Sequence, residues 1–236
     1  MATDEKIPVQ VVAMHGWAGD SRCWQPWIEA TAHLGWSWQC GERGYGNIAP
    51  REPAWPEDKL SSAIRVVIGH SLGPHLLSGD VWRTVNVVIL LASFGTFVPP
   101  DQTGRRVRAA LDGMAAQLGN QEQATRMLEK FLANAASPEP VGLMPPSPLD
   151  GPLNLSRLVS DLEILRQCHG LADGFPSSAR VLIVEAGEDR IVAPEAQAML
   201  REQLPAADVI GLPGAGHALL RTDVVSRAIR WIASQK

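Results

Sequence analysis

The pentapeptide G-H-S-L-G at residues 69–73 constrains this 236-residue chain more than any other segment. An apolar, β-branched run (V-V-I, residues 66–68) precedes it, and the segment that follows (P-H-L-L, residues 74–77) has helical character. A strand, a sharp turn and a helix around G-x-S-x-G predict a nucleophile elbow, in which the serine hydroxyl projects above the sheet edge. The two glycines fit, because side chains there would collide in so tight a turn. We therefore interpret Ser71 as a nucleophile rather than a serine in an ordinary glycine-rich turn.

A serine hydroxyl is a weak nucleophile, so this interpretation requires a general base and an acid that orients the base. In chains with this elbow, the acid and then the histidine follow the serine, each just beyond a later strand. The apolar run at residues 181–184 leads into a loop that contains Asp189, and a short strand at residues 208–212 leads to His217. We therefore predict that His217 takes the proton of Ser71 and that Asp189 orients His217.

Other acids and histidines compete for these roles. Glu188 neighbours Asp189, but adjacent side chains point in different directions and the loop pattern favours Asp189. Asp173 precedes the strand at residues 181–184, which places it at the wrong end of the sheet. The remaining histidines are interpreted as surface, packing or loop-bracing residues, and they are His15, His33, His70, His75 and His169.

Acyl transfer also requires backbone N–H donors that stabilise an oxyanion. The N–H of Leu72 follows the nucleophile and supplies one donor. An early strand at residues 9–14 ends in H-G-W, where we expect Gly16 to let the backbone turn so that the Trp17 N–H faces the site. An ordinary strand–helix turn is the alternative, and the position of this segment before the elbow strand argues against it.

The distribution of Val, Ile and Leu predicts the fold class. Apolar segments alternate with helical or loop segments, which is typical of an α/β fold with a mostly parallel central sheet flanked by helices. Between residues 99 and 170 the periodicity becomes helical, which predicts a lid inserted into a core formed by residues 1–98 and 171–236. Strands are expected near residues 9–14, 37–41, 65–70, 86–92, 180–185 and 207–212.

The predicted lid carries both apolar and basic side chains. Helical segments are expected at residues 105–111, 121–136 and 155–169, with a proline-rich loop at residues 138–152. Met114 and Leu118 belong to an apolar stripe that would roof the serine and line an acyl channel, although packing alone also explains such a stripe. Arg126 and Lys130 contribute to a positive face on which an acidic partner would dock, and a solvated helix face is the alternative.

Composition limits the partners of the chain. Its formal net charge of −4 argues against nucleic acid. The three cysteines lack disulfide or metal-ligand spacing, which predicts free thiols in a reducing compartment. Residues 1–6 are polar without an apolar signal-peptide core, and no apolar run is long enough to span a membrane. These features predict a cytoplasmic protein that requires neither a metal nor an organic cofactor.

Several of these segments together resemble the α/β-hydrolase superfamily. They are H-G-W at residues 15–17, R-G-Y-G at residues 43–46, the elbow, and the loops of Asp189 and His217. The resemblance covers nearly the whole chain and implies an α/β-hydrolase fold with a serine–histidine–aspartate triad. It also implies that the Trp17 position and the residue after the serine supply the oxyanion donors.

Within the superfamily, the chain is most similar to the pimeloyl-[acyl-carrier protein] methyl esterases of biotin synthesis. The markers are M-A-A-Q-L at residues 114–118, Arg126 and Lys130 ahead of F-L-A at residues 131–133, and D-L-E-I-L-R at residues 161–166. The similarity implies a serine carboxylesterase that hydrolyses the methyl ester of pimeloyl-[acyl-carrier protein]. It also implies that Arg126 and Lys130 contact the acyl carrier protein and its phosphopantetheine arm.

Two features depart from that family. His70 stands where the best-known members carry Trp, and the segment between Gly46 and Arg65 is short and proline-rich, which predicts a truncated helix before the elbow strand. Both departures preserve the chemistry but leave the substrate open. The alternatives are a lipase-like or C–C-bond hydrolase acting on a small apolar ester or ketone, a haloperoxidase, and a non-catalytic binding protein of the same fold.

Overall fold

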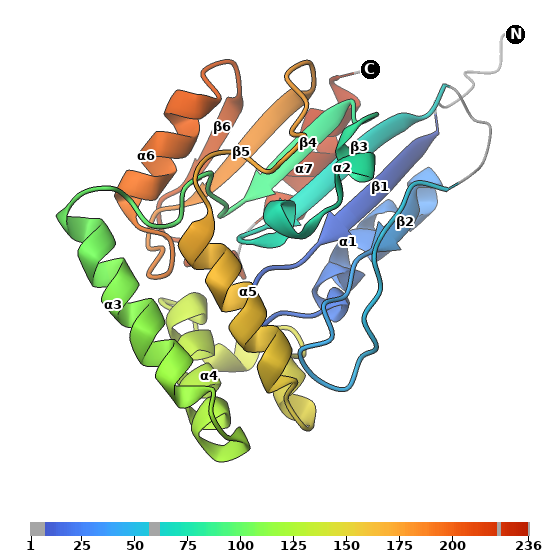
Figure 1. The fold of residues 1–236 in the computed structure, drawn as a ribbon. Coiled ribbons are helices and arrows are strands. Elements are labelled where there is room, and N and C mark those ends of the chain that lie inside the picture. The colour runs from blue at the N-terminus through green and yellow to red at the C-terminus, as the bar shows by residue number, and fades with distance from the viewer. Residues whose placement is uncertain (1–7, 57–61, 221–222, 236) are drawn as a thin grey trace, which may run out of the picture.

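A single parallel sheet organises the computed structural model, which describes residues 8–56, 62–220 and 223–235 (Figure 1). Six strands are hydrogen bonded in the order β2-β1-β3-β4-β5-β6, and every neighbouring pair is parallel. The predicted α/β fold is therefore confirmed, whereas the polar segment at residues 1–6 lies outside the described residues. The strands are β1 (Val9–Met14), β2 (Ser37–Cys40), β3 (Ile64–His70), β4 (Val87–Leu91), β5 (Arg180–Ala186) and β6 (Asp208–Leu212).

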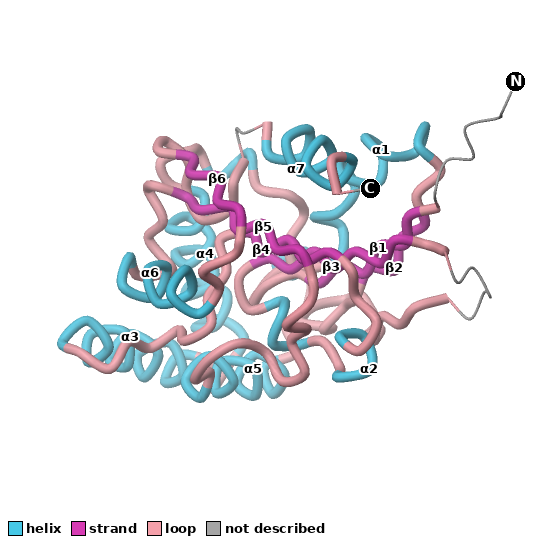
Figure 2. Tube along the Cα trace, turned by 90° about the horizontal axis from the view of Figure 1, so that it is seen from above, coloured by secondary structure: helices cyan, strands magenta, loops and turns pink. Residues whose placement is uncertain are grey.

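Alternate residues of the central strands enter different hydrophobic cores, because successive side chains of a strand point to opposite faces. In β3, Val66 and Ile68 pack in one core, and Val67 packs in the other. Figure 2 shows α1 and α7 on one face of the sheet, with α2 and α6 on the other. The helices of the core are α1 (Gln25–Thr31), α2 (Gly79–Trp82), α6 (Pro194–Gln203) and α7 (Val224–Ala233).

The strand order places the ends of β1 and β3 side by side. The chain runs from β1 outward to β2 and then returns to the other side of β1 to form β3. This reversal creates a topological switch point, and the carboxyl ends of the strands beside such a point are where α/β sheets bind ligands. The segments after β1 and β3 hold the predicted oxyanion loop and the predicted elbow, so the topology brings them together.

Three longer helices lie between β4 and β5 in the chain and gather beyond the lower ends of the strands in Figure 1, and Figure 2 shows α3 and α5 on the side of the sheet away from α1 and α7. The side chains of Asp101, Asn120 and Asn154 each cap a helix by accepting a backbone N–H of its first turn. The first helix is longer than the predicted segment at residues 105–111, because its cap lies at Asp101. The lid helices are α3 (Gln102–Gln117), α4 (Gln121–Ala136) and α5 (Leu155–Gln167).

Several connections contain short 3₁₀ helices rather than α-helices. In the described part of the chain between β2 and β3 there is no helix, in agreement with the predicted truncation. The helical segment expected after the elbow is a 3₁₀ helix that ends when Leu77 adopts an extended conformation. The 3₁₀ helices are η1 (Ser21–Trp24), η2 (Ala32–Leu34), η3 (Gly73–Leu76), η4 (Val141–Leu143) and η5 (Pro148–Asp150).

Two further expectations from the sequence concern the cysteines and membrane-spanning segments. Cys23, Cys40 and Cys168 are free, as the absence of disulfide spacing predicted. Among the helices that the structure describes, none is both long enough and apolar enough to cross a bilayer.

A buried ion pair attaches the lid to the core. The Arg43 Nε and Nη2 atoms donate to the two carboxylate oxygens of Asp161 on α5, at 2.7 and 2.6 Å. The Tyr45 hydroxyl donates to the same carboxylate at 2.7 Å, and the Asp161 side chain is 0% exposed. A carboxylate removed from water in this way is stabilised only when charged and polar partners satisfy its oxygens. The R-G-Y-G segment therefore serves as an anchor for α5.

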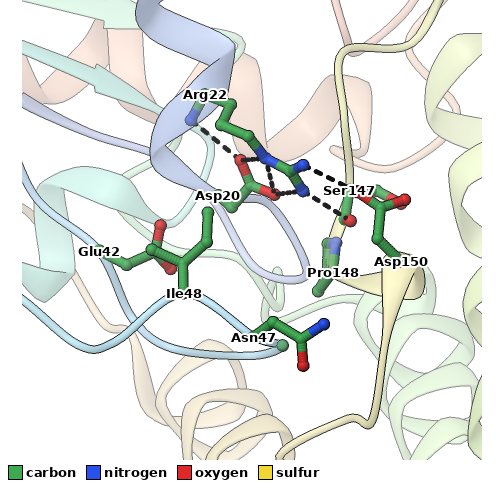
Figure 3. A pocket seen from close by; sticks show the side chains of 9 residues that line it. Asp20, Arg22, Glu42, Asn47, Ile48, Ser147, Pro148 and Asp150 are labelled. Atoms are coloured by element: carbon green, nitrogen blue, oxygen red, sulfur yellow. Dashed lines mark hydrogen bonds and ion pairs between the residues drawn. The ribbon is translucent and has the colours of Figure 1, made fainter.

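The lid loop has a second attachment, which Figure 3 shows from close by. Arg22 in η1 is held by Asp20 and donates to the carboxylate of Asp150 at 2.8 Å and to the carbonyl of Ser147 at 2.9 Å. These residues border a cavity of about 110 Å³ between the core and the lid loop. The lid thus contacts the core through its loop as well as through α5.

Removing one member of the buried ion pair should destabilise the protein strongly. We expect Arg43→Met to lower the free energy of unfolding by about 3–5 kcal/mol, because it leaves the Asp161 carboxylate buried without its cation. Urea denaturation measures this change. The control is Arg166→Met, which breaks the more exposed pairs with Asp112 and Glu163 and should cost less than about 1 kcal/mol. Equal losses would contradict an anchoring role of the Arg43–Asp161 pair.

Candidate active site

The turn after β3 has the strained backbone that an elbow requires. Ser71 has a φ of +54°, in the left-handed region that non-glycine residues rarely adopt. Two hydrogen bonds hold it there, since its N–H donates to Leu91 O at 2.9 Å and its carbonyl accepts the Ser93 hydroxyl at 2.7 Å. Strain of this kind persists only where the surroundings enforce it.

Both glycines of the elbow lie against other backbone or ring atoms. A Cβ on Gly69 would be 2.5 Å from Pro74 Cγ, and a Cβ on Gly73 would be 2.2 Å from the carbonyl oxygen of Met14. No side chain fits at such distances, so the structure agrees with the steric argument from the sequence.

The predicted base and acid are hydrogen bonded to each other. His217 Nδ1 lies 2.8 Å from Asp189 Oδ2, and the two side chains are 3% and 1% exposed. The other oxygen of Asp189 accepts the backbone N–H groups of Ile191 and Val192 at 2.7 and 2.9 Å. Burial opposes ionisation of Asp189, but His217 and these N–H groups outweigh it and lower the pKa of the carboxyl. Asp189 is therefore an anion that fixes the orientation of the imidazole.

The neighbouring carboxylate is in a different environment. Glu188 is exposed, as expected for a side chain that points away from its neighbour Asp189. His33 and His169 are also exposed, and His75 is half-buried with its Nε2 donating to the carbonyl of Phe94. The structure thus leaves these groups apart from the Asp189–His217 pair.

The residue before the serine, His70, contacts His217. His70 Nε2 lies 3.0 Å from the carbonyl oxygen of His217, and the two imidazole rings have centroids 4.9 Å apart. The Ser71 hydroxyl itself forms no hydrogen bond with the residues that the structure describes. Catalytic hydrogen bonds are often long in free enzymes and tighten when substrate binds. The sequence predicted only packing for His70, and its link to the base is an addition from the structure.

The H-G-W loop after β1 lies directly against the elbow. A Cβ on Gly16 would be 2.8 Å from Ser71 Cβ, so this glycine is required by close approach. The positive φ of the loop, +55°, belongs to Ala18, which corrects the expectation that Gly16 provides the turn. The backbone N–H groups of Trp17 and Leu72 donate to none of the described residues and are free to bind an oxyanion.

His15 fixes the orientation of the peptide that carries the Trp17 N–H. Its Nδ1 donates to the carbonyl of Gly16 at 2.9 Å, and its Nε2 accepts the N–H of Arg43 at 3.3 Å. The Gly16 carbonyl and the Trp17 N–H belong to one planar peptide, so holding one group directs the other. His15 braces the loop, as the sequence predicted.

The lid supports the loop of His217. Ala218 N–H donates at 2.9 Å to the carbonyl of Ala135, which lies in the last turn of α4 and has no partner within that helix. A Cβ on Gly216 would be 1.9 Å from the carbonyl oxygen of Ser137, so the loop and the end of α4 are in close contact. Trp17 also contacts the lid, because its indole N–H donates to the carbonyl of Leu158 at 2.9 Å.

The predicted lid contacts fall into two environments. Met114 is half-buried and Leu118 is buried, in the apolar cluster that also contains Trp17 and Leu72. Arg126 and Lys130 are exposed on α4, and Arg126 donates to Glu122 at 2.8 Å. Contact of these four residues with a substrate or a carrier protein stays a prediction.

The sequence interpretation gave no role to Asp161, although its position carries a signal. Leu158 and Leu165 lie three residues before and four residues after it, so Asp161 belongs to the apolar face of α5. An acid on such a face requires a buried cationic partner. The partner, Arg43, is 118 residues away in the chain and could be identified only from the structure.

The strained elbow, the histidine–carboxylate pair and the two free N–H donors, on a parallel sheet with a helical lid, define an α/β-hydrolase. The chain belongs to the alpha/beta hydrolase family, whose model matches residues 11–228. No curated protein sequence matches it significantly.

Solved structures share the fold across the whole chain. An esterase (EaEST) from Exiguobacterium antarcticum is 16% identical with a TM-score of 0.65, and the match covers 98% of this chain and 92% of that one. MenH from S. aureus is 14% identical with a TM-score of 0.65, with 100% and 97% covered. BioG from Haemophilus influenzae is 14% identical with a TM-score of 0.59, with 99% and 97% covered. At these identities the likeness establishes the fold alone.

The two neighbouring carboxylates should respond differently to neutralisation. We expect Asp189→Asn to lower kcat for ester hydrolysis by about 10⁴-fold, because an amide at this position stabilises the wrong tautomer of the histidine. Glu188→Gln is the matched control and should leave kcat near the wild-type value, since this side chain is exposed. Steady-state kinetics with a p-nitrophenyl ester measure both. A larger loss in Glu188→Gln would show that the acid is misassigned.

Proposed function

We propose that the protein is a serine carboxylesterase in which Ser71, His217 and Asp189 form the catalytic triad. The observation that carries the proposal is the Asp189–His217 hydrogen bond beside a serine in a strained left-handed turn. The free N–H groups of Trp17 and Leu72 support it, because acyl transfer requires donors for an oxyanion next to the nucleophile. The esterases among the structures of the same fold are consistent with ester chemistry.

The arrangement supports hydrolysis in two steps. His217 takes the proton of the Ser71 hydroxyl while its oxygen attacks the ester carbonyl, and the Trp17 and Leu72 N–H groups bind the oxyanion. His217 then gives the proton to the departing alcohol, which leaves an acyl group on Ser71. In the second step His217 deprotonates a water molecule that attacks the acyl carbonyl, and it returns this proton to the Ser71 oxygen as the acid is released. Asp189 stays ionised and stabilises the imidazolium throughout.

The substrate we propose is the methyl ester of pimeloyl-[acyl-carrier protein]. The support is the similarity in sequence markers on the lid, together with the apolar cluster that joins Met114 and Leu118 to Trp17. An acyl chain requires apolar surroundings, and this cluster lies next to the oxyanion loop. Cytoplasmic biotin synthesis is the setting that such a substrate implies.

Basic residues on the lid would receive an acidic carrier protein. Arg126 and Lys130 are exposed on α4, although Glu122 already pairs with Arg126. Three exposed arginines of α3 add to the positive charge of the lid, namely Arg105, Arg106 and Arg108. They form no ion pair with the described residues. Attraction over such a surface increases the rate of association more than the strength of a finished complex.

The first test of the proposed function removes the nucleophile. We expect Ser71→Ala to lower kcat for a p-nitrophenyl ester by about 10⁶-fold and to abolish labelling by a fluorophosphonate. The melting temperature should change little, because the variant loses only one oxygen atom. Retention of most of the activity would remove Ser71 from the mechanism. A wild-type protein that neither hydrolyses esters nor reacts with the fluorophosphonate would be a non-catalytic member of the fold.

The second test reverses the charge of the α4 surface. Arg126→Glu combined with Lys130→Glu should lower kcat/KM for methyl pimeloyl-carrier protein and flatten its dependence on salt, because attraction becomes repulsion. Hydrolysis of a short soluble ester should barely change.

The chain offers a matched control for this double variant. Arg227→Glu with Arg230→Glu makes the same change of charge on α7, where Arg227 pairs with Asp223 as Arg126 pairs with Glu122. Helix α7 lies on the opposite side of the sheet from α3 and α5 (Figure 2). Equal effects of the two double variants would mean that net charge acts without a docking site. A loss on both substrates would mean that the lid is damaged, and no loss on either would exclude carrier docking at α4.

A further inference from the structure

His70 lies between the loop that carries the oxyanion donor and the loop that carries the base. It is the last residue of β3, and its Nε2 lies 3.0 Å from the carbonyl oxygen of His217. A carbonyl only accepts hydrogen bonds, so Nε2 carries the proton and is the donor. On its other side, a Cβ on Gly16 would be 3.3 Å from His70 Nδ1 and 3.1 Å from its carbonyl oxygen. The His70 side chain is therefore bonded to the loop of His217 and leaves no room for a side chain at Gly16 in the other loop.

The surroundings keep His70 uncharged at neutral pH. Burial and then the nearby His217 lower the pKa of His70 to about 4, and His15 acts in the same direction. Asp189 and the hydrogen bond to the His217 carbonyl act in the opposite direction but do not outweigh these effects. A neutral imidazole with its proton on Nε2 is a permanent donor to the carbonyl. It also adds no second positive charge beside His217 when that ring becomes an imidazolium.

We propose that His70 is a positioning residue for His217, and that its hydrogen bond to the backbone carbonyl fixes the imidazole of the base relative to Ser71. The inference rests on the proposed esterase function. His70 and Ser71 are covalent neighbours, so the base loop cannot move away from the serine without breaking this bond. A displacement of about 1 Å at a reacting group lowers a rate by about 10²-fold.

The loop that carries His217 (the base loop) has a second support besides the His70 bond. The Ala218–Ala135 hydrogen bond holds the loop to the end of α4 on the lid. This bond restrains the loop from the lid side, whereas the His70 bond restrains it from the elbow. If the lid contact alone placed the base, the His70 donor would be dispensable.

The test compares variants of His70 that lack the donor with one that keeps it. His70→Phe and His70→Met remove the N–H, and His70→Gln retains an N–H at the end of a side chain. For a p-nitrophenyl ester we expect kcat to fall about 10- to 100-fold in the first two, with KM within about twofold of wild type. His70→Gln should recover kcat to within about threefold. The methionine variant serves if phenylalanine prevents folding.

His75→Phe is the matched control. His75 also donates its Nε2 proton to a backbone carbonyl, that of Phe94 at 3.0 Å, and its ring stacks on the Phe94 ring. Neither interaction involves the loop of His217. Loss of this bond should lower stability without lowering kcat. If kcat falls as much in His75→Phe as in His70→Phe, the effect of the His70 variant is explained by general destabilisation. That result would overturn the proposal.

Hydrogen exchange gives a readout that does not depend on turnover. The N–H groups of Ala218 and Leu219 are bonded to the carbonyls of Ala135 and Gly216, and their exchange should accelerate in His70→Phe but not in His75→Phe. Wild-type kcat and exchange in His70→Phe would overturn the proposal, as would an equal loss of kcat in His70→Gln and His70→Phe. If the wild type shows no esterase activity and no fluorophosphonate labelling, the proposed function fails. The exchange rates then still decide whether His70 holds the loop.

Discussion

The candidate site depends on direct contact between the end of β1 and the turn after β3. No side chain lies between them. Gly73 lies against the carbonyl of Met14, and Gly16 lies against the β-carbon of Ser71, both closer than a Cβ would allow. These approaches place the H-G-W loop, which carries the proposed oxyanion donor, beside Ser71. The parallel sheet makes them possible, because β1 and β3 are neighbours at the switch point. A side chain forced into either glycine position would cost about 1–3 kcal/mol through overpacking. It would also separate the Trp17 N–H from Ser71.

The lid helices support the residues of the candidate site. Its α4 end holds the loop of His217 through the Ala135 carbonyl, and its α5 helix binds the Trp17 indole. The same α5 helix is anchored by Asp161 to Arg43, whose backbone N–H reaches the histidine that braces the oxyanion loop. The loops of His217 and Trp17 are therefore each attached to both the core and the lid. Catalytic geometry and lid packing are coupled in this chain.

Much of the fold could be predicted from the sequence, because buried parallel strands are continuous Val, Ile and Leu runs with clear ends. The elbow strand, expected at residues 65–70, is Ile64–His70 in the structure. The loops of Asp189 and His217 were located for the same reason, since each follows such a strand. Contacts that depend on where the lid settles could not be predicted, and Arg43–Asp161 spans 118 residues of chain. The short helix after the elbow was also beyond prediction, because propensity does not show that Leu77 becomes extended.

The shortness of that helix has an electrostatic consequence. A long α-helix aligns its peptide dipoles and places roughly half a positive charge at its N-terminus, beside whatever group lies there. After Ser71 the chain forms only the four-residue 3₁₀ helix η3, and then it straightens. The segment after Ser71 therefore supplies no extended column of dipoles, and the donors proposed for the site are the individual N–H groups of Trp17 and Leu72. The field of such donors is short-ranged and directional, so its strength depends on the angle of two peptide planes rather than on the length of a helix.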